Sequence, residues 1–282
     1  MKIPERAYAK ANLYLDVTGL RADGYHGIES VMVTLPFYDV VSVEDADVVT
    51  VALEGRVSPD LAALPREKNL AYRAAGLFFE KSGISGGAKI TIEKKIPSRA
   101  GLGGGSADAA SALRALNALY GEPFSRDELI KISLPLGADV PFCVAGGAAL
   151  CRGIGEIMTP IDSKIELHGV VTSERAEKRS TADAYRAVDR ALCRVNETGD
   201  AASAALALET GDFDSLCKSA YNVFGEAGLY PEDARNLLKG EGAPFVLMSG
   251  AGPSVVALTA TARDAEKYHL LLLSRGFSSI LF

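Results

Sequence analysis

The chain has 282 residues, of which 48% are hydrophobic and 23% are charged, the balance of a folded globular protein and not of a disordered one. A chain of this length is expected to fold as one large or two medium-sized domains. The net charge of −6, with a pI near 5.3, argues against broad nucleic-acid binding, which needs a basic surface. It leaves room for a local basic pocket that binds a phosphorylated ligand.

The N-terminal segment 1–6 lacks the apolar core of a signal peptide, and no run of about 18 apolar residues occurs in the chain. We therefore expect a cytoplasmic protein that does not span a membrane. The four cysteines form no C-x-x-C pair, and the three histidines lie far from them in sequence, so a structural zinc site is not expected. Reduced thiols are favoured over a disulfide, because nothing indicates secretion.

The N-terminal half is expected to be rich in strands. Across residues 8–17 apolar and polar residues alternate, which is typical of a half-buried strand and places Lys10 and Asn12 on one face, away from the core. A plain solvated strand face is the alternative. Ser125 and Glu128 predict a capping box at the start of a helix. The expected strands cover residues 30–35, 40–43, 48–53 and 89–92, and the expected helices cover residues 69–81, 107–120 and 126–133.

The C-terminal half mixes the two types of element. Residues 146–151 are expected to form a strand, and a linker at residues 153–161 is the predicted domain boundary. Mixed elements without strict alternation predict an α+β fold with domains at residues 1–153 and 154–282. Beyond the linker, helices are expected at residues 181–195, 201–209, 231–239 and 262–275, and strands at residues 245–248, 255–258 and 279–282.

The segment Pro97–Asp108 has four glycines within five residues. Glycine costs backbone entropy in a helix or strand, so this composition favours a loop whose backbone approaches a ligand closely. The helix expected from residue 107 would point free N–H groups at the loop, which makes an anion site suited to phosphate. A Walker A loop is excluded because no Gly-Lys-Ser/Thr ends the segment, and a dinucleotide fingerprint is excluded because Ser106 stands where it needs glycine. A flexible surface turn is the alternative.

Three segments together resemble the motifs of the GHMP kinases, in the same order: Ala-Lys-Ala-Asn-Leu at residues 9–13, the glycine loop at residues 97–107, and Met-Ser-Gly-Ala-Gly-Pro-Ser at residues 248–254. The resemblance implies a two-lobed α+β fold, with an N-terminal ribosomal-protein-S5-like nucleotide lobe and a C-terminal ferredoxin-like lobe. It also implies ATP and Mg²⁺ as cofactors. Arg-Ala-Asp-Gly-Tyr-His at residues 21–26 and Gly-Ala-Asp-Val-Pro-Phe at residues 137–142 further resemble the kinases that phosphorylate the 2-hydroxyl of 4-diphosphocytidyl-2-C-methyl-D-erythritol, for isoprenoid precursors.

The same resemblance implies a role for individual residues. Asp139 would accept the proton of the acceptor hydroxyl and Lys10 would stabilise the charge; a helix N-cap ahead of Pro141 is the alternative for Asp139. The residues implied for ATP are Asn69, Leu70, Lys95, Pro97, Gly101, Leu102, Gly103, Gly104, Gly105, Ser106 and Ala107. Those implied for the substrate are Asn12, Tyr25, His26, Met32, Thr181 and Tyr185.

Some of these assignments have alternatives. Ser106 is the candidate protein ligand of Mg²⁺, whereas Asp108 is either a further metal ligand or a favourable charge at the helix N-terminus. Lys95, together with Lys94, is alternatively a solvated strand end. Tyr185 is alternatively a helix residue packed on the core.

Two other functions compete with this prediction. The first is another GHMP kinase, acting on homoserine, mevalonate or a sugar; residues 23–26 and Tyr185 argue against it, because those substrates have no base to stack. The second is a non-catalytic sensor with the same fold, against which the presence of both Lys10 and Asp139 argues. The expected partners are small molecules, with neither nucleic acid nor membrane, and the expected state is a monomer or weak homodimer. No role follows for Arg175, Lys178 and Arg179.

Overall fold

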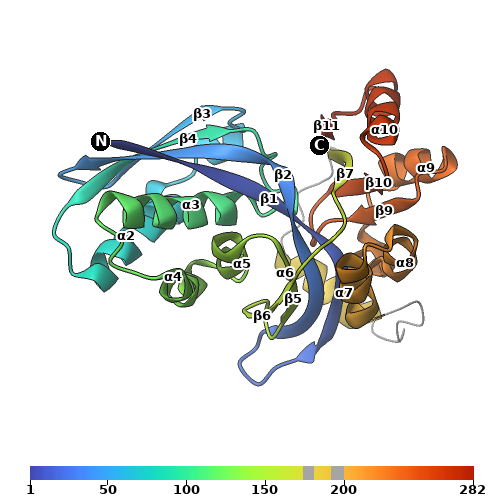
Figure 1. Cartoon of the computed structure of the whole chain (residues 1–282), viewed down its shortest axis with the longest axis horizontal. Coiled ribbons are helices and arrows are strands. Elements are labelled where there is room, and N and C mark those ends of the chain that lie inside the picture. Colours follow the sequence, from blue (N-terminus) through green and yellow to red (C-terminus); the bar gives the residue numbers. More distant parts are fainter. Residues whose placement is uncertain (174–180, 192–199) are drawn as a thin grey trace. The chain divides into compact units, whose positions relative to one another are not determined.

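The computed structural model describes residues 1–173, 181–191 and 200–282, which form the mixed helices and strands of an α+β fold (Figure 1). The chain falls into two compact units, neither continuous in sequence: the first unit consists of residues 1–10, 36–98 and 103–146, and the second unit of residues 11–35, 99–102 and 147–282. Strands β1 (Lys2–Leu20) and β2 (His26–Ala46) each contribute to both. The predicted domain boundary at residue 153 stays a prediction, and these units differ from it.

The first unit packs helices against strands ordered β3-β4-β2-β1, with β4 antiparallel to β2 and parallel to β3. Helices α2 and α3 pack on each other and on β4, and the core includes Phe78, Ile90 and Leu113. Besides β1 and β2, its elements are β3 (Thr50–Gly55), α1 (Pro59–Ala62), α2 (Leu70–Ser82), β4 (Gly87–Lys94), α3 (Gly104–Leu119), α4 (Arg126–Ser133) and α5 (Val140–Ala145).

The helix ends of this unit follow local chemistry. Asn69 caps the N-terminus of α2, and Gly83, with a left-handed φ of +68°, ends it. The capping box of Ser125 and Glu128 is present at the start of α4, so that prediction is confirmed. Alanines such as Ala109 and Ala112 leave α3 slim enough to lie close to its neighbours, and both are fully buried.

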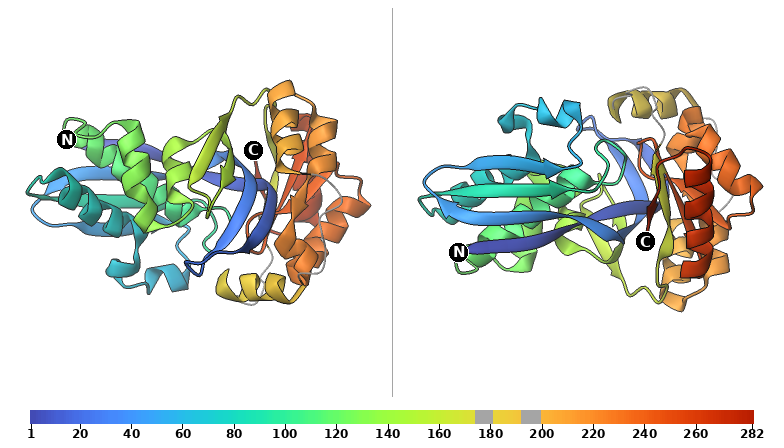
Figure 2. Two further views of the ribbon diagram at one scale, coloured as in Figure 1. Left: turned by 90° about the horizontal axis from the view of Figure 1, so that it is seen from below. Right: turned by 90° about the horizontal axis from the view of Figure 1, so that it is seen from above.

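The second unit contains a four-stranded antiparallel sheet in the order β11-β7-β10-β9. Helices α9 and α10 (orange to red in Figure 2) cover this sheet through apolar side chains such as Leu238, Tyr268 and Leu272. The chain order is β7, several helices, β9, β10, α10 and β11. This is the ferredoxin-like order of strands and helices, so the prediction of a ferredoxin-like lobe is confirmed. The elements are β7 (His168–Ser173), α6 (Thr181–Ala191), α7 (Ala201–Thr210), α8 (Phe213–Ser219), α9 (Glu232–Gly240), β9 (Phe245–Met248), β10 (Ser254–Thr259), α10 (Ala262–Ser274) and β11 (Ile280–Leu281).

Three short strands complete the second unit. Strand β5 (Ala148–Arg152) pairs with β2 and with β6 (Ile157–Ile161), and β8 (Tyr221–Asn222) runs parallel to β1. The linker expected at residues 153–161 is therefore wrong in part, because its second half is a paired strand.

Two further expectations are corrected. The strands expected at residues 30–35 and 40–43 form the single strand β2, and Pro36 lies where that strand passes from the second unit to the first. The helix expected from residue 107 begins at Gly104, so the last glycines of the loop belong to its first turn.

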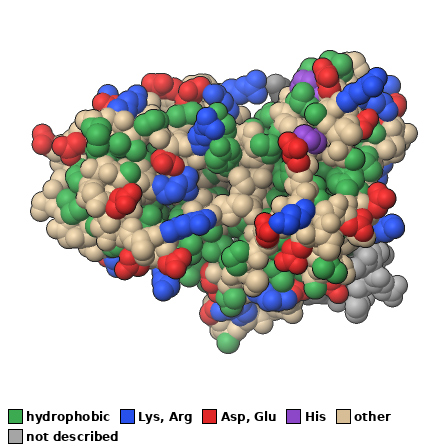
Figure 3. All heavy atoms as spheres, viewed as in Figure 1, with side chains coloured by type: hydrophobic (Ala, Val, Ile, Leu, Met, Phe, Trp, Pro, Cys, Tyr) green, Lys and Arg blue, Asp and Glu red, His purple; other side chains and the backbone are tan. Residues whose placement is uncertain are grey.

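The surface seen in Figure 3 has Lys and Arg side chains interspersed with Asp and Glu side chains, in keeping with the modest net charge of −6. Among the described residues, every helix is too short or too polar to cross a membrane.

Candidate active site

Lys10 and Asp139 form an ion pair in the first unit, with Lys10 Nζ 3.3 Å from Asp139 Oδ2. The side chain of Lys10 is 5% exposed and that of Asp139 is 34% exposed, so the carboxylate is the member that a ligand can reach. Asp139 stands at the N-cap position of α5, but its side chain makes no capping hydrogen bond there. Its carboxylate is thus directed to Lys10, and the N-cap alternative does not describe it.

The expectation that Lys10 and Asn12 face away from the core is wrong. Both are buried, at 4% and 3% exposed, although their strand alternates as predicted. The alternation of residue types identifies two faces of a strand, but both faces of β1 are covered in this region. A lysine buried in this way needs an anionic partner, and Asp139 provides it.

The short helix α5, which begins next to Asp139, is held by two arginines at its other end. Arg114 of α3 donates to the carbonyl oxygen of Cys143 (2.9 Å), and Arg126 of α4 donates to that of Ala145. These carbonyls have no partner within such a short helix, so the two guanidinium groups satisfy them and fix its direction.

The glycine loop packs directly on Lys10. Gly103 has φ +68°, and a Cβ placed on it would lie 2.7 Å from Cγ of Lys10, so only glycine fits. Gly103 is also the N-cap residue of α3 and offers no side chain to the free N–H groups of the first turn. Those N–H groups are left for an anion, beside a buried ammonium group.

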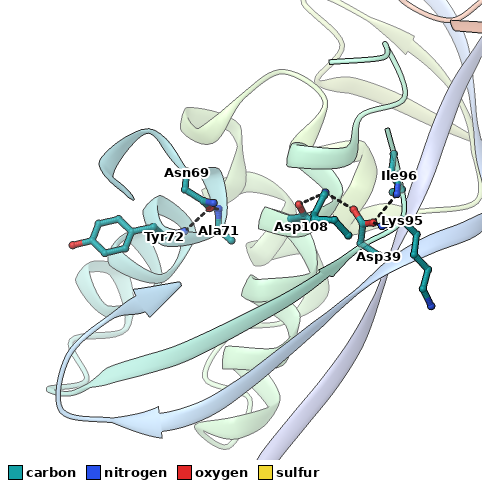
Figure 4. A network of polar contacts seen from close by, with 8 residues as sticks. Asp39, Asn69, Ala71, Tyr72, Lys95, Ile96 and Asp108 are labelled. Atoms are coloured by element: carbon teal, nitrogen blue, oxygen red, sulfur yellow. Dashed lines mark hydrogen bonds and ion pairs between the residues drawn. The ribbon is translucent and has the colours of Figure 1, made fainter. Parts of the chain in front are cut away.

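Three charged side chains, one of them on α3, are buried together near the N-terminal end of that helix. Lys94 Nζ donates to Asp39 Oδ2 and to Asp108 Oδ2 (2.6 Å), and none of the three residues is more than 6% exposed (Figure 4). Asp39 Oδ1 also accepts from the backbone N–H groups of Lys95 and Ile96, which lead into the glycine loop. We call Asp39, Lys94 and Asp108 the charge cluster. It ties the residues before the loop to the helix after it.

The two carboxylates of the charge cluster are not equivalent. Burial raises the pKa of Asp108 to about 7, against the lowering effect of Lys94. Burial alone would lower the pKa of Lys94, but the two carboxylates outweigh it and raise that pKa. Oδ1 of Asp108 is buried without a hydrogen-bond partner among the described residues, whereas Asp39 accepts from three donors. The carboxylate of Asp108 is buried and pairs with Lys94, which argues against Asp108 as a ligand of Mg²⁺.

In the second unit, the third glycine-rich turn contacts the residue that opens the glycine loop. Ser249 Oγ donates to the carbonyl oxygen of Gly101 (2.9 Å), and a Cβ on Gly101, where φ is +79°, would lie 2.1 Å from the carbonyl oxygen of Ser249. Asn222, which is 1% exposed, holds this turn by donating to the carbonyl oxygens of Met248 (2.8 Å) and Gly250 (2.9 Å). Sequence analysis missed Asn222, since a single asparagine between apolar residues gives no signal.

The loop before β2 presents Tyr25, and His26 is the first residue of the strand. Asp23 accepts from Arg21 Nη2 (2.8 Å) and from the backbone N–H of Tyr25 (3.1 Å), and the guanidinium lowers the pKa of Asp23. The ring of Tyr25 is exposed, whereas the side chain of His26 is only 13% exposed. The loop is thus shaped by its own charged residues, and it sends its two aromatic rings to different environments.

His26 and Tyr185, both predicted to contact the substrate, lie against each other. Their rings stack with centroids 4.6 Å apart and an angle of 21° between planes, and Phe224 meets the ring of Tyr185 edge-on at 5.0 Å. Asp189 Oδ1 lies 2.9 Å from Nε2 of His26. This aromatic cluster joins the loop before β2 to α6, and Asp189 is a member that sequence analysis did not identify.

The remaining predicted substrate residues have other contacts or positions. Asn12 donates to Ser30 Oγ (2.8 Å), which donates in turn to the carbonyl oxygen of Tyr14 (2.7 Å). Met32 is 1% exposed and pairs with Ala149 in the sheet, so it belongs to the core. Thr181 begins α6, and the predicted basic group at residues 175–179 lies outside the described residues.

The residues predicted to bind ATP occupy different settings. Leu70 is a neighbour of the loop, because a Cβ on Gly105 would lie 3.6 Å from its Cδ1. Lys95 is exposed and pairs with Glu93 at 3.2 Å, whereas the adjacent Lys94 is the buried one. Pro97 lies at the entry to the loop, and within it Leu102 and Ala107 are buried while Ser106 is half-buried.

Asn69 caps α2 through Oδ1, which accepts from the N–H groups of Ala71 (2.9 Å) and Tyr72 (3.3 Å) (Figure 4). Asn69→Ala should therefore cost about 1 kcal/mol of stability, whereas Asn69→Asp should keep the cap. If the side-chain amide also contacts adenine, both variants should raise the KM for ATP. Urea unfolding and initial rates measure the two effects separately; an unchanged KM in both variants would remove Asn69 from the adenine pocket.

Comparison with known proteins identifies the family. Residues 69–147 match the family described as GHMP kinases N terminal domain. The chain is 41% identical over 278 residues to the 4-diphosphocytidyl-2-C-methyl-D-erythritol kinase of Desulfitobacterium hafniense, which covers 96% of this chain and 92% of the relative. It is 38% identical to the protein of that name from Caldicellulosiruptor saccharolyticus, over 93% of this chain and 90% of the relative.

A solved structure agrees as well. The crystal structure of a 4-(cytidine 5'-diphospho)-2C-methyl-D-erythritol kinase superposes with a TM-score of 0.77 at 31% identity, over 99% of this chain and 98% of that one. Similarity at this level over nearly the full length exceeds what a shared fold alone would give. The chain belongs to the 4-diphosphocytidyl-2-C-methyl-D-erythritol kinase family of the GHMP kinases.

Proposed function

We propose that this protein transfers the γ-phosphoryl group of ATP to the 2-hydroxyl of 4-diphosphocytidyl-2-C-methyl-D-erythritol, a step in the non-mevalonate formation of isoprenoid precursors. The observation that supports it best is the ion pair of Lys10 and Asp139, in contact with a glycine loop at the start of a helix. Family membership supplies the identity of the acceptor.

The reaction needs a base for the acceptor hydroxyl. Asp139 accepts the proton of the substrate 2-hydroxyl while the oxygen of that hydroxyl forms a bond to the γ-phosphorus of ATP. The bond between the γ-phosphorus and the β–γ bridging oxygen breaks, and ADP is released. The ammonium group of Lys10 lies 3.3 Å from the carboxylate and stabilises the negative charge that develops on the attacking oxygen. Because Lys10 is buried, this interaction is only weakly screened by water.

The phosphates of ATP are bound by backbone and not by side chains. The free N–H groups of the first turn of α3 donate to phosphate oxygens, and the helix dipole favours their negative charge. Glycine at position 103 lets the backbone approach the nucleotide without a side chain between them. The charge cluster holds the residues before the glycine loop in a fixed position relative to α3 while the nucleotide binds.

Mg²⁺ fits this donor set as a partner of the nucleotide. Among the described residues no group of three or more His, Cys, Asp or Glu side chains could hold a metal, which suits an ion that takes most of its ligands from phosphates and water. Ser106, half-buried in the first turn of α3, would be the protein ligand through its hydroxyl group. When bound, the ion neutralises charge on the β- and γ-phosphates.

The cytosine base is assigned to the aromatic cluster. Tyr185 offers a ring that Phe224 supports from its edge, and Tyr25 is exposed and free to lie over a bound base. His26 supplies polar ring atoms beside the stack. Asn12 and Thr181 are assigned to the polar parts of the same substrate.

The test is a coupled assay of ADP release from Mg-ATP with 4-diphosphocytidyl-2-C-methyl-D-erythritol as acceptor. We expect turnover with this acceptor, competitive inhibition by cytidine diphosphate, and little activity with homoserine or mevalonate. Phosphorylation of either of those alcohols in preference to the cytidine substrate would refute the proposed substrate and keep the kinase. ATP binding without turnover of any acceptor would refute the activity as well.

A further inference from the structure

Helix α6 holds the ring of His26 through two contacts. Tyr185 stacks on the face of the imidazole at 4.6 Å, and Asp189 lies 2.9 Å from its Nε2. The two residues are four positions apart, so they lie on the same side of the helix. One contact fixes the plane of the ring and the other fixes its rotation within that plane.

The contact with Asp189 also decides which ring nitrogen bears the proton. A carboxylate can only accept a hydrogen bond, so Nε2 of His26 must be the donor. In the neutral imidazole the other nitrogen, Nδ1, then has a free lone pair and is an acceptor. Without Asp189 the ring could take either tautomer, and Nδ1 could be a donor or an acceptor.

An acceptor at Nδ1 distinguishes the two common pyrimidines. Cytosine has an amino group at C4, which donates, whereas uracil has a carbonyl oxygen at the same position, which accepts. We propose that Asp189 determines base specificity: by keeping the proton of His26 on Nε2, it leaves Nδ1 to accept from the 4-amino group of cytosine and to reject the 4-oxygen of uracil. The inference rests on the proposed function and adds a residue to it. Asp189 acts through His26, so it is a positioning residue.

The size of the preference for cytosine over uracil depends on the cost of leaving Nδ1 of His26 without a hydrogen-bond donor. A site that hydrogen-bonds a polar group discriminates strongly against an analogue that lacks the donor, because the acceptor is then buried without a partner. His26 is largely buried by its neighbours, so a mismatched Nδ1 is poorly compensated by water. We expect the parent protein to prefer the cytidine substrate over its uridine analogue by about 10²-fold or more in kcat/KM.

The experiment compares these two acceptors, 4-diphosphocytidyl-2-C-methyl-D-erythritol and its diphosphouridyl analogue, in four proteins at about pH 8.5, where histidine side chains are generally neutral. Asp189→Asn can donate to Nε2 through its amide and so permits the opposite tautomer. It should reduce the preference for cytidine by about 10-fold or more, while Asp189→Glu should restore most of it. Asp183→Asn is the matched control, because Asp183 lies on the same helix, is exposed and pairs with Arg186 instead; its preference should equal that of the parent.

A second measurement reads the tautomer directly. The ¹⁵N chemical shifts of the His26 imidazole should show a protonated Nε2 and a bare Nδ1 in the parent, and a mixture or a reversal in Asp189→Asn. The inference alone is overturned if the parent is active but Asp189→Asn keeps both the preference and the tautomer. A parent that phosphorylates neither acceptor overturns the proposed function, and the inference with it.

Discussion

Asp139→Asn should lower kcat by about 10²- to 10⁴-fold while the protein stays folded and binds nucleotide. Asparagine has the size of aspartate but does not take up the proton of the acceptor hydroxyl. The side chain is 34% exposed and makes no capping bond in α5, but the exchange takes the anionic partner away from the buried Lys10, so a loss of stability is expected and urea unfolding is measured beside the rates. Single-turnover measurement of phosphoryl transfer, beside ADP binding by calorimetry, separates a loss of chemistry from a loss of binding.

The matched control is Asp127→Asn, which alters an exposed carboxylate in the first turn of α4. Its turnover should match that of the parent. If Asp139→Asn turned over at a rate within a few-fold of the parent, Asp139 would position the acceptor without serving as its base. Equal losses in both variants would point instead to a general effect of removing negative charge.

The largest effect on stability is expected from Lys94→Met. This exchange roughly keeps the length of the side chain but removes the cation that, in the described part of the chain, pairs with both Asp39 and Asp108. Breaking a buried ion pair from one side costs about 3–5 kcal/mol, because the remaining charge is buried without compensation. Asp39 retains two backbone donors, whereas Asp108 loses its only partner among the described residues, so most of the cost should arise at Asp108. Urea unfolding followed by circular dichroism measures it.

Lys95→Met provides the control at the next position, since the side chain of Lys95 is exposed and pairs with the exposed Glu93 at the strand end, and the exchange leaves its backbone N–H in place. It should change the unfolding free energy little. The double variant Lys94→Met with Asp108→Asn should recover part of the loss, because it removes the carboxylate left uncompensated, and it also guards against a single variant too unstable to study. Equal and small losses in the Lys94 and Lys95 variants would contradict the role given to the charge cluster.

Much of the fold could be predicted because local rules decide it. The capping box at Ser125, the cap at Asn69 and the end of α2 before Gly83 all depend on residues within one turn of the helix end. The start of α3 was placed too late, since glycine is a poor helix former and Gly104 and Gly105 read as loop. Under the proposed function, their presence in the first turn allows close approach of a phosphate at the expense of helix stability.

The site could be predicted only where a motif contained it. Lys10 and Asp139 lie 129 positions apart, and no periodicity relates them; the family resemblance alone brought them together, and the ion pair agrees with it. The role of Lys94 was missed although a signal existed. Ile90 and Ile92 face inward in β4, and the same alternation places Lys94 on the buried face and Lys95 on the exposed one.

Other residues of the site, such as Asp189 and Asn222, have no signal in the sequence. Asp189 is one of many charged residues on an amphipathic helix, and only the folded position of His26 gives it a partner. Asn222 likewise acquires its function from two carbonyl groups more than twenty residues away along the chain. Such contacts depend on tertiary structure, which sequence pattern does not encode locally.

The passage of β1 and β2 through both units has a consequence for how such a protein can be divided. Lys10 and Asn12 are two positions apart on one strand, yet they belong to different units. No single cut in the chain separates the units, so neither can be produced from one continuous stretch of gene, exchanged for that of a relative at one junction, or lost by truncation without taking part of the other. Recombination between members of this family should therefore succeed for whole chains or for surface loops, and fail for half-chains joined near residue 153.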